Sequence, residues 1–264
     1  MIETAKQAAL SAATILMENF RKITSQQIRV KTKNDFLTHV DEQSEQEIIR
    51  ILHSTFPDHT ILAEESGLQD IVSDYRWIID PLDGTKNYIS GIPIFSISIA
   101  LQYQNQIILG VVHDPIHQEL FTAERNKGAF VNGQPIRVSQ TNHMEDCLLA
   151  TGFPFKYKKF LPVYMDCFED LFRQITSARR MGSAAIDLAY VAAGRFEAFW
   201  ELGLNPWDCA AGALLVEEAG GRVTDFWGQN NFLSNSYIVA SNGKVHTAIL
   251  TTIQKHFPGY KKVE

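Results

Sequence analysis

The hydrophobic residues at the start of the chain recur at the spacing of an α-helix. The positions that form this pattern are Ile2, Ala5, Ala9, Ala12, Leu16 and Phe20. Side chains three or four residues apart lie on one face of a helix, so the pattern predicts an amphipathic helix that buries this face. A second helix is predicted between Asp41, its candidate N-cap, and Pro57, which ends it. Its inward-facing residues are Ile48, Ile49, Leu52 and Phe56.

The following segment changes to the patterns of β-strands. Two short apolar runs, residues 60–63 and 75–79, each end at acidic residues. Residues 95–102 alternate between apolar and polar side chains, and residues 107–113 follow closely, which predicts an antiparallel pair. Asn132-Gly133 lies between two further short runs and predicts a β-hairpin, because both residues accept the backbone angles of a tight hairpin turn.

The second half of the chain alternates strands with helices. Ser183 is the predicted N-cap of a helix that Gly194 ends, and Pro206 opens another helix that stops at Gly220-Gly221. No internal repeat and no low-complexity linker divides the sequence. Mixed sheets packed between layers of helices are the natural way to bury these apolar faces.

Length and composition narrow the class of protein. The chain has 264 residues, 45% of them hydrophobic, which is enough for one large compact unit or two closely packed lobes. A net charge of −6 gives no general electrostatic reason to bind nucleic acid. Three widely separated cysteines argue against a disulfide framework, and no apolar stretch approaches the roughly 18 residues of a membrane helix. We therefore expect a cytoplasmic protein with no signal peptide, no membrane contact and no direct binding of nucleic acid.

The run from Trp77 to Thr85 carries the clearest candidate chemistry. An apolar strand leads directly into Asp80-Pro81-Leu82-Asp83-Gly84-Thr85. Pro81 fixes one backbone angle, so that the chain turns and Asp83 comes round toward Asp80. Two adjacent carboxylates repel each other unless a cation lies between them, and hard oxygen ligands favour magnesium, manganese or calcium over zinc. A solvated Asp/Pro/Gly turn with a threonine cap is the alternative for such a motif taken alone.

Two other acidic motifs are excluded by counting. An EF-hand loop starting at Asp80 would need a carboxylate at its twelfth position, which here is Gly91. The phosphoaspartate phosphatases need Asp-x-Asp-x-Thr, whereas the second aspartate here comes one position too late.

Two motifs resemble the signatures of a known family. Residues 80–85 (DPLDGT) resemble the first signature of the inositol monophosphatase family, and residues 207–212 (WDCAAG) resemble its second. Similar segments follow the family's order along nearly the whole chain, at residues 31–41, 63–66, 151–156 and 179–195. The last two most resemble the bacterial branch, whose known member also takes part in ribosomal RNA transcription.

The resemblance implies a fold and an activity. The expected fold is α+β, a five-layered α-β-α-β-α sandwich that forms a single unit over residues 1–264. Within it, an N-terminal α+β lobe is expected at about residues 1–140 and a C-terminal α/β lobe at about residues 141–264. The expected reaction is magnesium-dependent hydrolysis of myo-inositol monophosphate, sensitive to lithium, by a homodimer. Water is the expected nucleophile, so no phosphoenzyme should form.

The resemblance also assigns roles to individual residues. It implies that Glu64, Asp80 and the Leu82 carbonyl hold one metal, and that Asp80, Asp83 and Asp208 hold a second. A third, weaker magnesium near Glu64 would bring the number to two or three per subunit, with Mn²⁺ or Ca²⁺ able to substitute. Asp41 and Thr85 would orient the attacking water, and Glu64 completes the expected catalytic set. The expected substrate contacts are Gly84, Thr85, Gly182, Ser183, Ala184, Glu201 and Asp208.

Several alternatives stay open at this stage. Glu201 is either a ligand for ring hydroxyls or an exposed acid beside Gly203, and Asp187 either braces the same wall or is structural. Lys86 either strengthens phosphate binding or points outward, and Cys209 is either an oxidation-sensitive thiol or a small buried hydrophobe.

The substrate and the partners are also open. Relatives with similar signatures hydrolyse fructose 1,6-bisphosphate, 3′-phosphoadenosine phosphates, histidinol phosphate or NADP. A role of another class is binding to transcription antitermination factors or RNA polymerase, independent of catalysis. The aromatic-rich segment Phe153 to Phe172 either forms an interface or belongs to the core.

Overall fold

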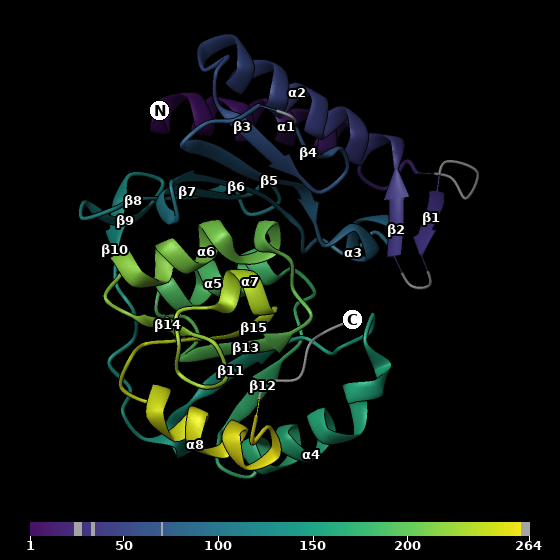
Figure 1. Ribbon diagram of the computed structural model, residues 1–264. Coiled ribbons are helices and arrows are strands. Elements are labelled where there is room, and N and C mark those ends of the chain that lie inside the picture. Colours follow the sequence, from purple (N-terminus) through teal and green to yellow (C-terminus); the bar gives the residue numbers. More distant parts are fainter. Residues whose placement is uncertain (24–27, 33–34, 70, 260–264) are drawn as a thin grey trace.

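The chain forms alternating layers of helices and sheets, seen edge-on from top to bottom in Figure 1. This computed structural model describes residues 1–23, 28–32, 35–69 and 71–259. Helices α1 (Ile2–Asn19) and α2 (His39–Thr55) form the outer layer above a large sheet. Helices α5 (Ala184–Ala192) and α6 (Pro206–Glu218) lie between this sheet and a smaller one. Helices α4 (Leu161–Phe172) and α8 (His246–His256) cover the far side, which completes the expected five-layered α+β sandwich.

The two helices of the first layer form where the apolar spacing predicted them. The buried side of α1 consists largely of alanines, which let it lie close to α2 and to the sheet. The start of α2 differs from the prediction, because its N-cap is Thr38 and not Asp41. Asp41 is the third helical residue and its carboxylate accepts the Thr38 backbone N–H, which closes a capping box. Asp41 is thereby held at a fixed place and fully buried.

The large sheet has eight strands in the order β10-β9-β8-β7-β6-β5-β3-β4. Their bounds are β3 Thr60–Ala63, β4 Gly67–Leu68, β5 Tyr75–Asp83, β6 Ser96–Tyr103, β7 Gln106–Asp114, β8 Glu119–Glu124, β9 Gly128–Val131 and β10 Gln134–Ile136. The predicted antiparallel pair is β6 and β7, and the predicted hairpin at Asn132-Gly133 joins β9 to β10. Strand β5 is longer than its apolar run because it continues through Asp80 to Asp83, where its pairing with β6 shifts register.

The smaller sheet has five strands in the order β12-β11-β13-β15-β14. Their bounds are β11 Leu148–Thr151, β12 Ser177–Arg179, β13 Ala198–Leu202, β14 Arg222–Thr224 and β15 Tyr237–Ser241. Strands β12, β11 and β13 run parallel, whereas β15 is antiparallel to β13 and β14. The two sheets are built from separate halves of the chain. The division into two lobes near residue 140 stays a prediction.

Close approach of the middle layer to the large sheet depends on small residues. A Cβ at Gly110 in β7 would lie 2.7 Å from the Ala211 carbonyl oxygen in α6, and one at Gly212 would lie 2.5 Å from the Leu188 Cβ in α5. Glycine is therefore required at both positions for α6 to lie as near to β7 and α5 as it does. This packing fixes the position of the N-terminus of α6, which carries Asp208.

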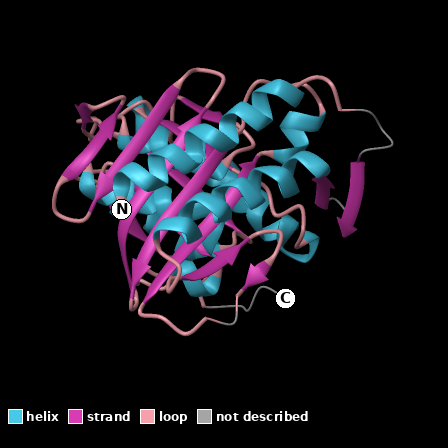
Figure 2. Cartoon of the chain, turned by 90° about the horizontal axis from the view of Figure 1, so that it is seen from above, coloured by secondary structure: helices cyan, strands magenta, loops and turns pink. Residues whose placement is uncertain are grey.

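Short elements complete the chain. These are β1 (Ile28–Thr32), β2 (Asp35–Thr38), α3 (Thr85–Ile89), α7 (Phe232–Asn235) and two 3₁₀ turns at Met144–Asp146 and Lys158–Phe160. Figure 2, seen from above, shows the antiparallel pair β1 and β2 standing at one edge of the molecule. Residues 33 and 34 of the family-like segment 31–41 lie outside the described residues.

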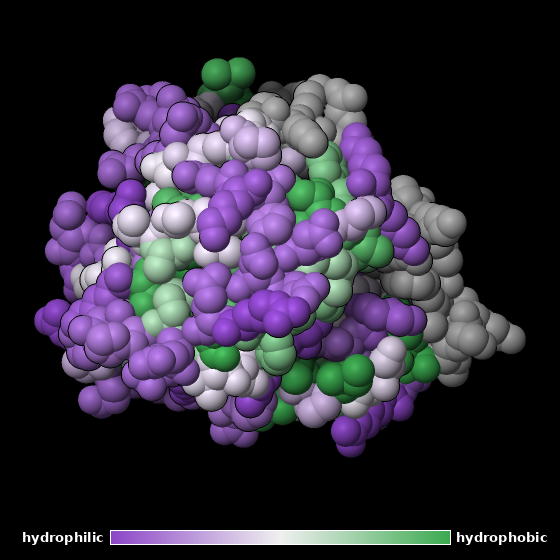
Figure 3. Space-filling view, turned by 90° about the horizontal axis from the view of Figure 1, so that it is seen from below, coloured by the Kyte–Doolittle hydropathy of each residue, from purple (hydrophilic) through white to green (hydrophobic). Residues whose placement is uncertain are grey.

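Helix α4 uses its aromatic-rich segment both for the core and for the surface. Tyr164 and Leu171 are buried against the smaller sheet, whereas Leu161, Met165 and Phe172 are exposed. Figure 3 shows the face seen from below, which α4 and α8 cover, and apolar patches lie there among polar atoms. The segment therefore contributes to the core and also leaves large apolar side chains on this face.

Candidate active site

Two neighbouring strands bring the first acids together. Strands β3 and β5 run parallel with Ala63 paired to Ile79, so Glu64, which directly follows β3, lies beside Asp80 of β5. The Glu64 N–H donates to the Ile79 carbonyl (3.1 Å), which ties the two strand ends. Strand β5 then passes through Pro81 and Leu82 to Asp83. Ser44 of α2 donates to the Pro81 carbonyl (2.9 Å) and supports this turn from behind.

The expected site residues line one cavity of about 140 Å³. It contains Glu64, Asp80, Leu82, Asp83, Gly84, Thr85, Gly182, Ser183, Ala184, Asp187, Glu201 and Asp208. These residues come from both halves of the chain, so the cavity forms only when the two sheets pack around the middle helices. Asp41 is the one predicted site residue that does not line the cavity, and it contacts the cavity through Thr85.

Each metal-candidate aspartate is anchored by hydrogen bonds from the chain. Asp80 accepts the Leu82 N–H (3.0 Å), and Asp208 accepts the Asn205 N–H (2.6 Å) in the capping box that starts α6. Asp83 accepts both the Ser183 hydroxyl and the Ala185 N–H, each at 2.7 Å. These bonds fix where the carboxylates stand, because each donor belongs to a helix start or a tight turn.

The electrostatics of the cavity favour a bound cation. Burial, with a smaller contribution from the negative charge of Glu64, raises the pKa of Asp83 to about 6 against the lowering effect of its hydrogen bonds from Ser183 and Ala185. Burial also holds the pKa of Asp80 well above its usual range, with added repulsion from Glu64, Asp83 and Asp208. Burial and the negative charges of Glu64 and Asp83 likewise hold the pKa of Asp208 well above its usual range. Buried carboxylates within such reach of each other become favourable as anions when a divalent cation neutralises them.

The residues present fit a hard divalent cation by their chemistry. Four carboxylates and the Leu82 segment offer only oxygen donors, which is the ligand set of magnesium, calcium or manganese. Within the described part of the chain, no three histidine, cysteine, aspartate or glutamate side chains are grouped tightly enough to hold a metal as they stand. The case for a divalent cation therefore depends on the oxygen donors that are present and on the repulsion between the four carboxylates, which a cation would relieve.

A hydroxyl and a buried acid form a pair at the back of the cavity. Thr85 opens the short helix α3, and its hydroxyl lies 3.2 Å from the Asp41 Oδ1 and 3.1 Å from the Leu82 carbonyl. The other carboxylate oxygen of Asp41 accepts from the Thr38 hydroxyl (2.5 Å). Burial raises the pKa of Asp41 to about 6, against the lowering effect of the Thr38 hydrogen bonds. With its proton directed at Asp41, the Thr85 oxygen is left with lone pairs that can accept a hydrogen bond.

Glu201 lies inside strand β13 and not on the surface. Its side chain is 6% exposed, which rules out the exposed-acid alternative. Any side chain at Gly152 would overlap the Glu201 carboxylate, so the glycine makes room for it against β11. Burial raises the pKa of Glu201 to about 8, although the nearby Arg180 lowers it. Asp187 is also buried at the cavity, and its Oδ1 atom has no hydrogen-bond partner.

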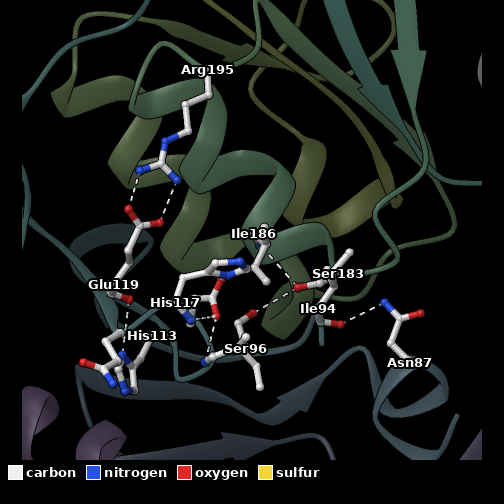
Figure 4. Close-up of polar contacts among 12 residues, drawn as sticks. Asn87, Ile94, Ser96, His113, His117, Glu119, Ser183, Ile186 and Arg195 are labelled. Atoms are coloured by element: carbon white, nitrogen blue, oxygen red, sulfur yellow. Dashed lines mark hydrogen bonds and ion pairs between the residues drawn. The ribbon is translucent and has the colours of Figure 1, made fainter. Parts of the chain in front are cut away.

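The start of α5 lines the cavity through Gly182, Ser183 and Ala184. Figure 4 shows Ser183 between Ser96 and Ile186, to both of which it is hydrogen-bonded. Because the Ser183 hydroxyl donates to Asp83, it accepts from the Ser96 hydroxyl at 3.0 Å. Asn87 of α3 donates to the carbonyls of Ile94 (2.8 Å) and Met181 (2.9 Å), which joins the two halves of the chain beside the cavity.

The far end of α5 is tied to the large sheet. Arg195 forms a bidentate ion pair with Glu119 of β8 and stacks on Tyr190, with 4.5 Å between guanidinium carbon and ring centroid. His113 bonds to the Glu119 carbonyl, and His117 pairs with the buried Asp114 at 2.7 Å. Both histidines therefore make local structural contacts.

Several cavity residues were not singled out from the sequence. Lys156 and Arg180 line the rim together with Lys86, and all three are exposed. Apolar contacts come from Phe153, Pro154, Phe155, Tyr157 and Leu204. The segment 151–156 was recognised as family-like, but its part in the cavity depends on how the loop after β11 folds back. Lys86 faces the cavity, and Cys209 is buried as the small hydrophobe that the second alternative described.

Comparison with known proteins identifies the family. The model of the inositol monophosphatase family matches residues 1–257. The chain belongs to the inositol monophosphatase family. A relative named Nus factor SuhB from Pseudomonas aeruginosa is 46% identical over 263 residues, which cover 98% of this chain and 97% of the relative.

Solved structures of the family share the fold. The extragenic suppressor protein suhB from Bartonella henselae matches with a TM-score of 0.93 and 40% identity over 96% of this chain and 98% of that one. The inositol monophosphatase from Anabaena matches with a TM-score of 0.86 and 37% identity over 96% and 95%. Family membership shows that the chain is of the phosphatase type. Among the described residues, no helix is long and apolar enough to cross a membrane.

Proposed function

We propose that this chain hydrolyses phosphate monoesters with magnesium and releases phosphate from myo-inositol monophosphate. The observation that carries the proposal is the convergence of Glu64, Asp80, Asp83 and Asp208 on one buried cavity. Membership of the inositol monophosphatase family supports the reaction class. The hydroxyl-accepting wall around Glu201 supports a polyol as the leaving group.

We assign the metal ligands from the acids of the cavity. Glu64, Asp80 and the Leu82 carbonyl would hold one magnesium, and Asp80, Asp83 and Asp208 a second. When bound, the metal supplies positive charge to the phosphoryl oxygens and lowers the pKa of coordinated water. Backbone hydrogen bonds at the strand end and the helix starts support Asp80, Asp83 and Asp208 in these roles.

Thr85 and Asp41 orient the nucleophile in this proposal. The Thr85 hydroxyl donates to Asp41, so its oxygen can accept a hydrogen bond from a water on the cavity side. Such a water is aligned with one lone pair toward the phosphorus. The capping box at Thr38 holds Asp41 in place, which makes the pair rigid.

The leaving group would contact the opposite wall. The backbone of Gly182, Ser183 and Ala184 and the carboxyl of Glu201 face the cavity there. The N–H groups of Gly84 and Thr85, where α3 begins, would face the phosphate. In this proposal the polyol would lie between β13 and α5, and the phosphate near β5.

A phosphate-release assay tests the proposal. Purified protein should release phosphate from myo-inositol 1-phosphate with magnesium, and chelation by EDTA or addition of lithium should stop it. Asp83→Asn or Asp208→Asn should abolish turnover with the fold intact, while Asp166→Asn, an exposed acid on α4, should behave as wild type. Near-normal turnover by either cavity variant at saturating magnesium would refute the two-metal assignment.

A panel of phosphate esters tests which of the family's substrates this chain prefers. Fructose 1,6-bisphosphate, a 3′-phosphoadenosine phosphate, histidinol phosphate and NADP are assayed beside the inositol ester under the same conditions. A kcat/KM at least about tenfold higher for one of these compounds would replace inositol monophosphate as the proposed substrate.

A second candidate function is a role in transcription antitermination. Relatives such as the P. aeruginosa protein carry the name Nus factor SuhB at 46% identity. We propose that this chain also binds antitermination factors or RNA polymerase through protein contacts, since its net charge of −6 disfavours direct contact with RNA. A pull-down with the Asp83→Asn protein should recover these factors if binding is independent of catalysis. Recovery of none would remove this role.

We further propose that the protein acts in the cytoplasm as a homodimer. All three cysteines are free and buried, which suits a reducing compartment. The exposed apolar side chains of α4 offer a surface for self-association. Light scattering across a concentration series should give twice the chain mass, and a constant monomer mass would contradict the dimer.

A further inference from the structure

One face of helix α2 lies behind the loops that carry the metal-candidate groups. Ser44 and Glu45 follow Asp41 by three and four residues, so the three side chains lie on the same face of the helix, and all three are buried. Asp41 contacts the cavity through Thr85. Ser44 and Glu45 do not line the cavity. Any effect of these two residues on the site is therefore exerted through the segments that they contact.

Glu45 holds the turn that contains Glu64. Strands β3 and β4 are joined by the three-residue turn 64–66. The Glu45 Oε2 atom accepts the Glu65 N–H at 2.8 Å, and its Oε1 atom accepts the Ser66 N–H at 2.9 Å. The Glu64 N–H is already bonded to β5. The turn is therefore held at one end by the sheet and at the other end by α2.

The preceding residue of α2 holds the other loop. The Ser44 hydroxyl donates to the Pro81 carbonyl at 2.9 Å. The next residue along that loop is Leu82, whose carbonyl we assign to the same metal as Glu64. Adjacent residues of one helix thus contact two separate loops, so that the spacing between these loops depends on α2.

Holding the Glu64 turn requires the carboxylate of Glu45. Within the described part of the chain, its hydrogen-bond partners are the two backbone N–H groups, and no cation pairs with it. Burial of an anion without a cation is unfavourable, and only these two charge-assisted hydrogen bonds offset it. A glutamine of the same shape could accept only one of the N–H groups, because its other terminal atom is a donor.

We infer that Glu45 and Ser44 are positioning residues for a divalent cation, because they hold the Glu64 turn and the Leu82 segment at a spacing that lets both bind one ion. This inference rests on the proposed function, which assigns both groups to one magnesium. Neither positioning residue would touch the ion, the water or the substrate. Both act by placing the backbone from which the ligands extend.

Metal titration without substrate tests the inference. Mn²⁺ is the probe, because it takes the same oxygen ligands as magnesium and its free ion is measured by electron paramagnetic resonance. Calorimetry on the same samples gives the dissociation constants. Glu45→Gln should raise the dissociation constant of at least one Mn²⁺ ion by about tenfold or more, as is usual when a group that supports a metal ligand is lost. Ser44→Ala, which removes one neutral hydrogen bond, should raise it by about threefold or more.

Two comparisons separate placement from charge. Glu47→Gln makes the same change on the same helix, at a carboxylate that pairs with Arg50 on the surface, and it should keep the wild-type constants. Ser44→Ala alters no charge, so a weaker Mn²⁺ constant in this variant cannot come from a lost electrostatic attraction. If Glu45→Gln does not fold, Ser44→Ala alone decides the inference.

The magnesium dependence of turnover provides a readout that a purely structural role would not move. In both variants, the magnesium concentration that gives half-maximal phosphate release should rise in step with the Mn²⁺ constant. At saturating magnesium, kcat should recover to within about threefold of the wild type, with KM for myo-inositol 1-phosphate unchanged. A variant that only lost folded protein would instead show a lower kcat at every magnesium concentration and an unchanged half-maximal point.

The outcomes separate this inference from the proposed function. Mn²⁺ constants within twofold of the wild type in both variants overturn the inference, while the phosphatase activity stands. An effect confined to Glu45→Gln assigns the change to the lost charge and also overturns it. If the wild type binds Mn²⁺ but hydrolyses no ester, the proposed reaction fails, and the Mn²⁺ constants of the variants still decide the inference. A wild type that binds no Mn²⁺ would refute both.

Discussion

His246, the first residue of α8, provides a pH-dependent contribution to stability that can be calculated from its surroundings. The ring is fully buried between two hydroxyls, with Ser241 at 2.8 Å from Nδ1 and Thr224 at 2.9 Å from Nε2. The Thr224 hydroxyl donates to the Asp225 carbonyl, so it accepts from Nε2–H, and Nδ1 accepts from Ser241. The site is therefore built for a neutral imidazole.

The size of the effect follows from the pKa. Burial, with a smaller contribution from the charge of Arg222, lowers the pKa of His246 from 6.5 to about 4. As the pH falls, the unfolded chain binds a proton first, so the stability gained from the neutral ring is complete above pH 6.5 and lost between there and pH 4. Linkage gives a loss of about 2 kcal/mol at pH 5 and about 3 kcal/mol at pH 4.

Urea unfolding of the wild type and of His246→Gln at pH 8, 7, 6, 5 and 4 measures this loss. The buried carboxyls of the cavity have raised pKa values and act in the opposite direction, but they titrate in both proteins and cancel in the difference. The wild type should lose about 2 kcal/mol relative to the variant between pH 8 and pH 5. A difference constant within about 0.5 kcal/mol, or an NMR titration of the ring near 6.5, would refute the reasoning.

Three further predictions concern the cavity and its support. Thr85→Val removes the hydroxyl that orients water, so kcat should fall by about 10²-fold or more with KM little changed, as steady-state kinetics with myo-inositol 1-phosphate will measure. Glu201→Gln should raise KM for the same ester by about tenfold. The KM for phenyl phosphate, which lacks ring hydroxyls, should not change. An equal change in KM for both substrates would exclude contact between Glu201 and the polyol. Gly212→Ala should destabilise the fold by about 1–3 kcal/mol in urea unfolding, because its Cβ would overlap Leu188, and unchanged stability would show that α5 and α6 can separate at no cost.

Much of the fold was predictable because its signals are local. The helix at the N-terminus follows from apolar spacing, and the helices capped at Ser183 and opened by Pro206 follow from residues at their own ends. The cap of α2 was assigned wrongly to Asp41, because Thr38 and Asp41 are both good capping residues and only the three-dimensional turn decides between them. Short strands such as β12 and β14 have no local signal, since three residues form a strand only when a partner is present.

The same distinction applies to the cavity. The acids at 64, 80, 83 and 208 were predicted because each follows a strand or opens a helix within a family motif. The burial of Glu201 was not decided by the sequence, because the glycine that makes room for it is Gly152, which directly follows a different strand, β11. The same limit applies to the rim, since Arg180 reaches the cavity only through the turn at Gly182. The positions of such residues depend on contacts with other segments of the fold, and these contacts cannot be predicted from local sequence patterns.

Helix α6 shows how a residue predicted from a sequence motif depends on tertiary packing for its position. It carries Asp208 in its first turn, and its central residues 209–216 are buried between the large sheet and the smaller one. The helix can sit there only because Gly110 and Gly212 leave space on either side of it. A displacement of the helix by a bulkier residue at either glycine would move Asp208 relative to Asp80 and Asp83, which belong to a strand of the large sheet. The geometry of the acids is therefore set by interior packing as much as by the acids themselves, and this is why motif residues alone cannot specify the site.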